Sequence, residues 1–375
     1  MSKTVKIALT LVLLTGFGAA LWFALRGQSA SVAQQAEAVA VSSATPLKGV
    51  IALDVEPFFN DARVKKILAA KRLPVEVTRI GSREMAAQVQ PGMALDFLFP
   101  SGVVAANQIA DAARKAKIAV AQSSPFYSPM VIASWKPVAD ILVANGMAKA
   151  TGDRVYGVDI VKLTETMLAR KRWKDLAKAQ AYDVSRGVLV STTDVRRSNS
   201  AAMYLALTSY AKNGDVVTDR AVAEPLARQL AELFKRQGYQ ENYVNGNFDD
   251  YVAIGLGKTP LAFIYEYQLV SYAIAKKGIG EGMVLMYPQP TIVNKVVFMA
   301  TNERSRALAE LLGRDPELQK IAVEYGFRIA DTGAFMQAVK PTGLAVEERI
   351  AQIVDPPSYE VMAQMIDVVA QEMAK

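Results

Sequence analysis

The alternation of strands and helices in residues 49–121 constrains the fold of this chain more than any other feature. Short apolar runs bounded by turn residues predict strands at residues 49–55, 75–80, 96–99 and 118–121. Segments with helical spacing predict intervening helices at residues 57–71, 82–88 and 102–115. Strands separated by helices in this way indicate βα units and an α/β fold with a mostly parallel sheet.

Polar residues follow each of these predicted strands. The strand ends carry Glu56, Ser82, Ser101 and Ser123. In open α/β sheets, ligands bind beyond the carboxyl ends of the strands, so these residues lie at one edge of the predicted sheet. The first lobe of the protein therefore has one edge at which a ligand site is expected.

Residues 187–210, GVLVSTTDVRRSNSAAMYLALTSY, predict a buried strand, a polar turn and a buried helix in direct succession. The turn brings hydroxyl groups, free backbone N–H groups and the positive end of a helix dipole to one point. Such a point suits a carboxylate, a phosphate or another oxyanion. The alternative interpretation is that Ser198 or Asn199 only caps the helix and that the arginines of the turn are solvated.

The composition excludes several classes of function. The chain has 375 residues, enough for about two lobes, and contains neither cysteine nor histidine. It therefore lacks disulfides, Ser-His triads and the usual ligands of zinc or haem, and no cofactor or catalytic residue is predicted. A hard cation held by oxygen ligands stays open. The net charge of +7 comes without any nucleic-acid-binding motif, so nucleic acid is not an expected partner.

Two motif fragments fail on inspection. Gly257-Lys258-Thr259 looks like the end of a phosphate-binding loop, but Val252 stands where the first glycine belongs. Residues 245–250 are rich in oxygen ligands, yet Leu256 occupies the position of the closing glutamate of a calcium loop. A surface turn is the better interpretation of that stretch.

Residues 7–25 carry no charged side chain and are long enough to cross a bilayer. Lys3 and Lys6 precede them, which places the N-terminus in the cytoplasm and the rest of the chain outside. We therefore expect a single-pass anchor in a bacterial inner membrane, with a tether over residues 28–46. A cleaved signal peptide that releases a secreted periplasmic protein is the alternative, because small residues follow near Ser29. Without cysteine, lipid attachment to a cysteine is excluded.

The rest of the chain predicts a second lobe. The pattern breaks at residues 125–129, a new strand is expected at residues 130–135, and a return crossing at residues 291–301. Apolar residues at helical spacing predict a final helix near Met362 and Val369. The expected organisation is an anchor (1–27), a linker (28–46), lobe 1 (47–124 and 291–375) and lobe 2 (125–290).

Several segments in this order resemble the type 2 periplasmic (extracellular) solute-binding proteins, in the branch related to molybdate- and sulfate-type binders. SSPFYSPMVIASW at residues 123–135 looks like the crossover between lobes, and residues 187–210 look like the serine-rich ligand turn. PLAFIYEYQ at residues 260–268 and YGFR at residues 325–328 look like the late strand-to-helix turn and the ending. The resemblance covers roughly residues 48–329.

The resemblance implies two α/β lobes, two mixed and mostly parallel sheets flanked by helices, and a two-stranded hinge, with closure around a small solute in the cleft. The cleft residues it implies are Ser101, Ser128, Thr193, Arg197, Ser198 and Tyr265. It implies a non-catalytic protein that captures an oxyanion or small zwitterion for an ABC-type transporter or a sensor. The competing hypothesis is a ligand-free envelope interaction protein that keeps the fold.

Two features depart from the family. The turn after the first strand reads Asp54-Val55-Glu56-Pro57, and an acidic group there opposes an anion in the same cleft. Glu56 is expected to face a cationic part of the ligand or to pair with Arg83. The expected N-terminal anchor is the second departure, and it suggests work at a fixed place on the membrane or within an assembly.

Overall fold

The computed structural model describes residues 44–238, 240 and 244–375. The expected anchor at residues 7–25 and most of the expected tether lie outside the described residues. Within the described ranges, no helix is both long and apolar enough to cross a bilayer.

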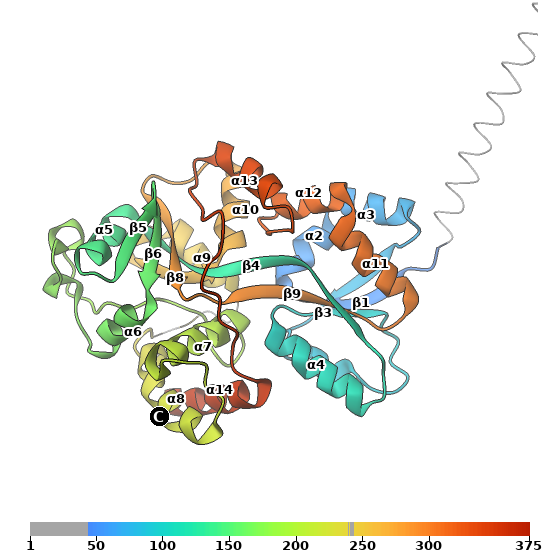
Figure 1. The fold of residues 1–375 in the computed structure, drawn as a ribbon, viewed down its shortest axis with the longest axis horizontal. Helices are drawn as coiled ribbons and strands as arrows, with labels where there is room; N and C mark the ends of the chain where they lie inside the picture. Colours follow the sequence, from blue (N-terminus) through green and yellow to red (C-terminus); the bar gives the residue numbers. More distant parts are fainter. Residues whose placement is uncertain (1–43, 239, 241–243) are drawn as a thin grey trace, which may run out of the picture.

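The described strands form one connected mixed sheet in the order β2-β1-β3-β9-β4-β8-β6-β5, with β7 paired to β4 (Figure 1). Their bounds are β1 Leu47–Ile51, β2 Val75–Arg79, β3 Phe97–Phe99, β4 Ala121–Trp135, β5 Ala148–Gly152, β6 Val155–Asp159, β7 Leu261–Tyr265, β8 Met283–Gln289 and β9 Val293–Ala300.

Helices flank this sheet in both halves of the molecule (Figure 1). The α-helices are α2 Glu56–Asn60, α3 Ala62–Ala70, α4 Val103–Lys115, α5 Lys136–Ala144, α6 Ile160–Leu168, α7 Asn199–Asn213, α8 Arg220–Lys235, α9 Val244–Ala253, α10 Glu266–Lys276, α11 Glu303–Arg314, α12 Pro316–Glu324, α13 Thr332–Val339 and α14 Tyr359–Met373. Short 3-10 turns lie at η1 Leu53–Val55, η2 Met85–Gln88, η3 Trp173–Asp175, η4 Ala179–Tyr182, η5 Gly255–Gly257 and η6 Lys340–Thr342.

The βα prediction is confirmed for the first three strands. β1 pairs in parallel with β2 and with β3, so their carboxyl ends meet at one edge. The prediction of mostly parallel sheets is wrong, because β3–β9, β4–β7, β4–β8, β4–β9 and β5–β6 are antiparallel. The hairpin β5–β6 and the returning strands produce these antiparallel pairs. The expectation of two separate sheets is also corrected, because β4 belongs to both halves.

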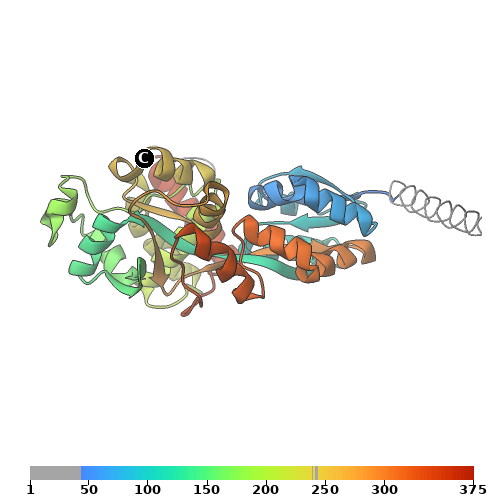
Figure 2. The same cartoon turned by 90° about the horizontal axis from the view of Figure 1, so that it is seen from above.

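β4 is the element that joins the two halves of the molecule. Its first part pairs with β9, and its second part pairs with β7 and β8. The sequence predicted two strands here, separated by residues 125–129. The chain instead stays extended through Pro125 and Pro129, with a register shift between Ser123 and Phe126. Figure 2 shows the two halves side by side along the long axis, with β4 passing between them.

The strand, turn and helix predicted at residues 187–210 are present in altered form. Residues 187–191 are extended, but only Ser191 bridges β7, by pairing with Ala262. α7 follows, and it is buried on nearly every side as its sequence predicts. It ends at Gly214, whose φ of 83° closes the helix.

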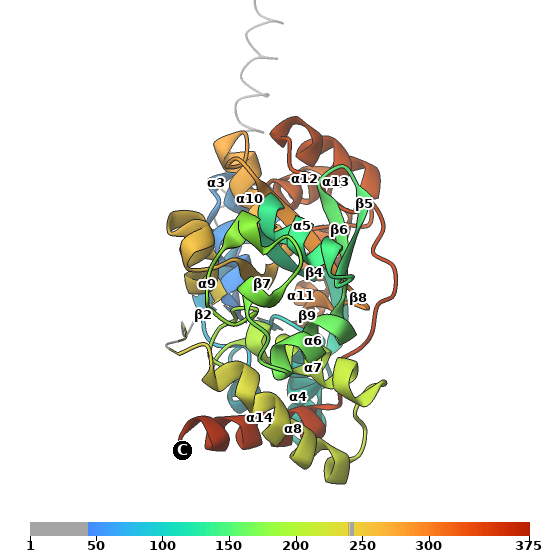
Figure 3. The same ribbon diagram turned by 90° about the vertical axis from the view of Figure 1, so that its left-hand side faces the viewer.

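The last helix packs on the opposite half from the one expected. α14 was assigned to lobe 1 with residues 291–375, but it packs mainly against α8 and also touches α7 and α4. Figure 3 shows α8 and α14 together at one end, with α12 and α13 at the other. The connecting segment, residues 343–358, is fixed on the way by Thr291, which exchanges backbone hydrogen bonds with Gln352 and Val354 at 2.9 Å each. The apolar stripe of α14 therefore finds its partner on α8.

Candidate functional site

A buried polar cluster lies where the two halves meet. On the side of β1 and β3, the carboxylate of Asp54 accepts a hydrogen bond from Ser101 Oγ at 2.5 Å. Asn294 on β9 donates to the same hydroxyl at 2.9 Å, and Ser101 N donates to Ser82 Oγ at 2.9 Å. Asp54, Ser101 and Asn294 are all buried, at 8%, 4% and 1% exposure. Parallel pairing of β1 and β3 brings the first two together.

The other half supplies Asn199 and Tyr265. Asn199 is the first residue of α7, and its amide donates to the hydroxyl of Tyr265, the last residue of β7, at 3.0 Å. A Cβ atom on Gly102 would lie 2.9 Å from Asn199 Nδ2 and 3.1 Å from Asn294 Oδ1. Gly102 has φ 87° and ψ 148°, a conformation that suits glycine. The two halves thus touch at Gly102, and we call this contact between Gly102 and Asn199 the seam.

A second hydroxyl group lies in the turn before α7. Ser200 Oγ is 2.8 Å from Thr193 Oγ1 and 3.0 Å from Ser198 Oγ. Ser198 is the N-cap residue of α7, yet its side chain makes no capping hydrogen bond. The interpretation of Ser198 as only a helix cap therefore does not fit its geometry.

Asp194 shapes this turn. Its carboxylate accepts from Arg196 N at 2.9 Å and pairs with the Arg196 guanidinium at 2.5 Å. Burial alone raises the pKa of Asp194, but the hydrogen bonds and charge of Arg196 outweigh it and hold that pKa below the ordinary value. Both oxygens of the Asp194 carboxylate thus accept hydrogen bonds from Arg196 within the turn.

A direct hydrogen bond also crosses between the halves. Arg83, in the loop after β2, donates to the backbone carbonyl of Arg196 at 3.1 Å. Glu56 was expected to pair with Arg83, but it pairs with Arg79 at 3.1 Å. The reason is geometric: α2 begins at Glu56 beside the end of β2, whereas the side chain of Arg83 reaches the turn of the other half.

Two of the six predicted site residues, Ser128 and Arg197, stand outside both the buried cluster and the hydroxyl group in the turn before α7. Ser128 is fully buried in β4, and its hydroxyl accepts a hydrogen bond from Tyr267 N at 3.0 Å. Arg197 is exposed on the turn. The structure brings Ser101 together with Tyr265, and it joins Thr193 and Ser198 through the hydroxyl of Ser200.

Burial changes the proton affinity of the cluster. It raises the pKa of Asp54 above its ordinary value, while the Ser101 hydroxyl, the Asp54 backbone and the Asn294 amide each lower it. Burial and the nearby Asp54 charge raise the pKa of Tyr265 and of Tyr267, so both phenols stay protonated near neutral pH. All groups that act on the pKa of Asp54 are neutral.

Asn294, like Asp54 and Asn199, belongs to the cluster but was not among the six predicted site residues. Asn294 lies in the strand VNKVVFMA beside the exposed Lys295, and a polar amide next to a long apolar run was the available signal. Its Oδ1 is buried and finds no hydrogen-bond partner among the described residues. Such an atom points to a group that is supplied from elsewhere.

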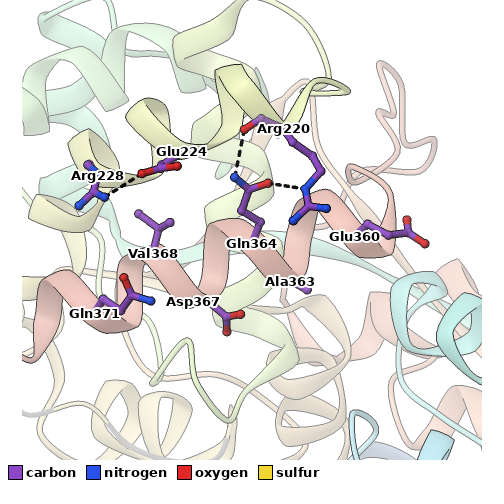
Figure 4. A pocket seen from close by; sticks show the side chains of 9 residues that line it. All are labelled: Arg220, Glu224, Arg228, Glu360, Ala363, Gln364, Asp367, Val368 and Gln371. Carbon is purple, nitrogen blue, oxygen red and sulfur yellow. Dashed lines mark hydrogen bonds and ion pairs between the residues drawn. The ribbon is translucent and has the colours of Figure 1, made fainter.

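The polar pocket between α8 and α14 lies away from this cluster. Figure 4 shows Gln364 of α14 joined to Arg220 of α8, with the Gln364 amide donating to the Arg220 carbonyl at 3.1 Å. Arg228 of α8 also pairs with Glu372 of α14 at 2.6 Å. These contacts hold α14 on α8.

Comparison with known proteins supports the fold and leaves the ligand open. No protein-family model and no curated protein matches the sequence. The solved structure of the sulfate-binding protein SubI from Mycobacterium tuberculosis H37Rv matches with a TM-score of 0.51 at 13% identity, covering 85% of this chain and 96% of SubI. An ABC transporter structure from Clostridium perfringens ATCC 13124 matches with a TM-score of 0.50 at 12% identity, covering 87% and 99%.

The fold is therefore mixed α/β, with a large mixed sheet and flanking helices, like that of the type II periplasmic binding proteins. At these identities the likeness extends to the fold alone.

Proposed function

We propose that this protein is a solute-binding protein whose halves close around a small polar solute at the junction between them. The observation that carries the proposal is the convergence of polar groups from both halves. Ser101 comes from the end of β3, and Tyr265 comes from the end of β7, with the amide of Asn199 beside it. Sites between two α/β lobes are a common place for small ligands, and hinge closure is a common response.

The two-stranded connection fits such a hinge. β4 leaves the first half, and β8 and β9 return to it, so two extended segments join the halves. The closed protein would then deliver its solute to an ABC-type transporter or be recognised by a sensor. The fold likeness to SubI, which is named as sulfate-binding, supports this class of function.

Native mass spectrometry of the full chain, purified in mild detergent without refolding, tests the proposal. We expect a co-purified small molecule that is lost from a Ser198→Ala variant. Ser209→Ala is a matched control on the same helix, because its hydroxyl donates to Ala206 O at 2.7 Å within α7. Loss of the molecule from both variants, or from neither, would contradict a site at the junction.

We also propose that residues 7–25 anchor the protein in a membrane, with the described residues on the periplasmic or outer side. The support is the uncharged apolar run and the lysines before it. Alkaline extraction of membranes should leave the full chain in the pellet. A variant that begins at residue 28 should be released, and release of the full chain would favour cleavage instead.

A ligand-free interaction protein is the second candidate. The direct contacts favour it, because Arg83 already bonds to Arg196 and α14 already touches α4 across the junction. Under this hypothesis the mass spectrum shows no bound molecule, and no anion, amino acid or metal raises the melting temperature. A ligand at a hundred times its Kd would add about 2.7 kcal/mol of stability, so a real ligand is easily seen.

A further inference from the structure

Asp54 differs from an ordinary buried carboxylate, because every group around it is a neutral donor. The Ser101 hydroxyl donates to it at 2.5 Å, and the Asn294 amide and the Asp54 backbone also act on it. The phenols of Tyr265 and Tyr267 lie near enough for its charge to act on them. Among the described residues, no lysine or arginine forms an ion pair with it. A buried carboxylate of this kind is usually paired with a cation.

Two helix N-termini add positive potential to the junction. α4 begins directly after Ser101 and Gly102, and its N-cap residue Gly102 has no side chain with which to cap the helix. α7 begins at Asn199, beside Gly102, and the side chain of its N-cap residue Ser198 makes no capping hydrogen bond. Several other helices are capped by an acidic or hydroxyl side chain, as α3 is by Asp61. Uncapped helix N-termini favour a negative charge close by.

The Oδ1 atom of Asn294 provides a second, independent observation. It is buried and has no hydrogen-bond partner among the described residues, and it lies at the seam beside Gly102. This acceptor suits a solute with an N–H group. It does not suit the oxygen of an anion.

We propose that the Asp54 carboxylate occupies the position that a solute anion would otherwise take, and thereby determines the specificity of the junction. The hydroxyl, the amide and the helix N-termini form an anion-binding environment, and the protein fills it with its own charge. A free oxyanion is then excluded by like charge and by lack of space. The solute accepted beside it is neutral or zwitterionic, with an N–H group that can reach Asn294. This inference rests on the proposed function.

Titration calorimetry with sodium sulfate and with sodium molybdate tests this inference on the full chain at constant ionic strength. Wild type should bind neither anion. Asp54→Ser removes the charge and makes room while it leaves Ser101 and Asn294 in place, so this variant should bind at least one anion about 100-fold more tightly than the weakest binding that the titration of wild type could have detected. Asp54→Asn removes the charge but keeps the volume, so it should gain much less.

Glu56→Gln is the matched control, because Glu56 is two residues away and pairs with Arg79 on the surface. It should leave anion binding absent. The inference is overturned if wild type binds either anion as tightly as Asp54→Ser, or if folded Asp54→Ser binds neither. Circular dichroism establishes folding, and if Asp54→Ser fails to fold, Asp54→Gly provides the same space.

The outcomes separate this inference from the proposed function. An oxyanion found bound to wild type in the mass spectrum would overturn the role of Asp54 and leave a solute-binding protein. A gain of anion binding by Asp54→Ser, with wild type empty of any solute, would support the role of Asp54. That result would also favour the interaction protein over the solute-binding protein.

Discussion

Two buried carboxylates on opposite sides of the hinge have contrasting surroundings. Glu266 is fully buried at the start of α10, and Arg328 pairs with it through two hydrogen bonds of 2.6 and 2.9 Å. The Tyr287 hydroxyl also donates to it, at 2.5 Å. Asp54 is almost as buried but has only neutral donors. The charge of Glu266 is neutralised by Arg328 within the fold, whereas Asp54 forms no ion pair with a lysine or arginine among the described residues.

Arg328 also fixes the chain that leads to α14. Its guanidinium donates to the backbone carbonyl of Glu348 at 3.0 Å and to that of Glu347, and it lies 4.5 Å from the ring centre of Phe335. Burial lowers the pKa of Arg328, but the Glu266 charge outweighs this and raises it above the ordinary value. The Glu266–Arg328 pair therefore holds the start of α10 and the segment at Glu347 and Glu348 together.

Breaking the Glu266–Arg328 pair should have the largest effect on stability. Arg328→Met leaves the Glu266 carboxylate buried without a cation, which should lower the free energy of unfolding by about 3–5 kcal/mol. Urea denaturation followed by circular dichroism measures this change. Replacing both partners, as in Glu266→Met with Arg328→Met, should restore much of the loss. A double variant as unstable as the single one would show that the backbone contacts of Arg328 matter more than the charge.

Disturbing the seam should have the next largest effect. Gly102→Ala forces a side chain into a backbone conformation that favours glycine and into contact with Asn199, so we expect a loss of about 1–3 kcal/mol. Gly214→Ala is the matched control, because Gly214 also has a positive φ but has no atom within 4 Å of an added Cβ. An equal loss in the two variants would mean that the seam adds nothing. Hydrogen exchange at the start of α7 should quicken only in Gly102→Ala.

The unpaired carboxylate of Asp54 should make the stability of the protein depend on pH. Because the pKa of Asp54 is raised in the folded protein, its contribution to stability is present below the ordinary value near 3.8 and is lost as the pH rises through the raised value. Asp54→Asn lacks this loss, so its stability relative to wild type should increase as the pH rises from about 4 through the range in which Asp54 titrates in the folded protein, by about 1.4 kcal/mol per unit of raised pKa. Melting curves across that range measure the trend. A difference that shrinks as the pH rises would contradict an Asp54 with a raised pKa.

The exposed carboxylate should matter least. Glu56 and Arg79 form a partly exposed pair at 3.1 Å, and such pairs contribute about 0–1 kcal/mol. Glu56→Gln should therefore change the midpoint of urea denaturation only slightly, and by less in high salt. A loss of stability as large as that of Gly102→Ala would show that Glu56 contributes substantially to the stability of the fold.

The sequence by itself determined much of the local structure. Apolar runs bounded by turns located β2 and β3, and an unbroken apolar surface located α7 as a core helix. These elements can be predicted from short-range patterns, because the spacing of apolar residues along the sequence indicates which side chains of a strand or helix are buried. The polar turn before α7 and Ser101 at the end of β3 were also visible from the sequence, and the structure brings Ser101 together with Tyr265 across the junction.

Only the tertiary structure decided which residues meet. β4 stays extended through two prolines because β9 pairs with its first part and β8 pairs with its last part. No local sequence pattern encodes that pairing. Asn294 joins Ser101 from 193 residues away, and α14 packs on α8 instead of returning to lobe 1. Asp54 and Glu56 lie two residues apart in one acidic turn, yet one is buried among donors and the other pairs at the surface. Such differences depend on long-range packing, because the charge of a residue is fixed by its sequence but its solvation and partners are set by the fold.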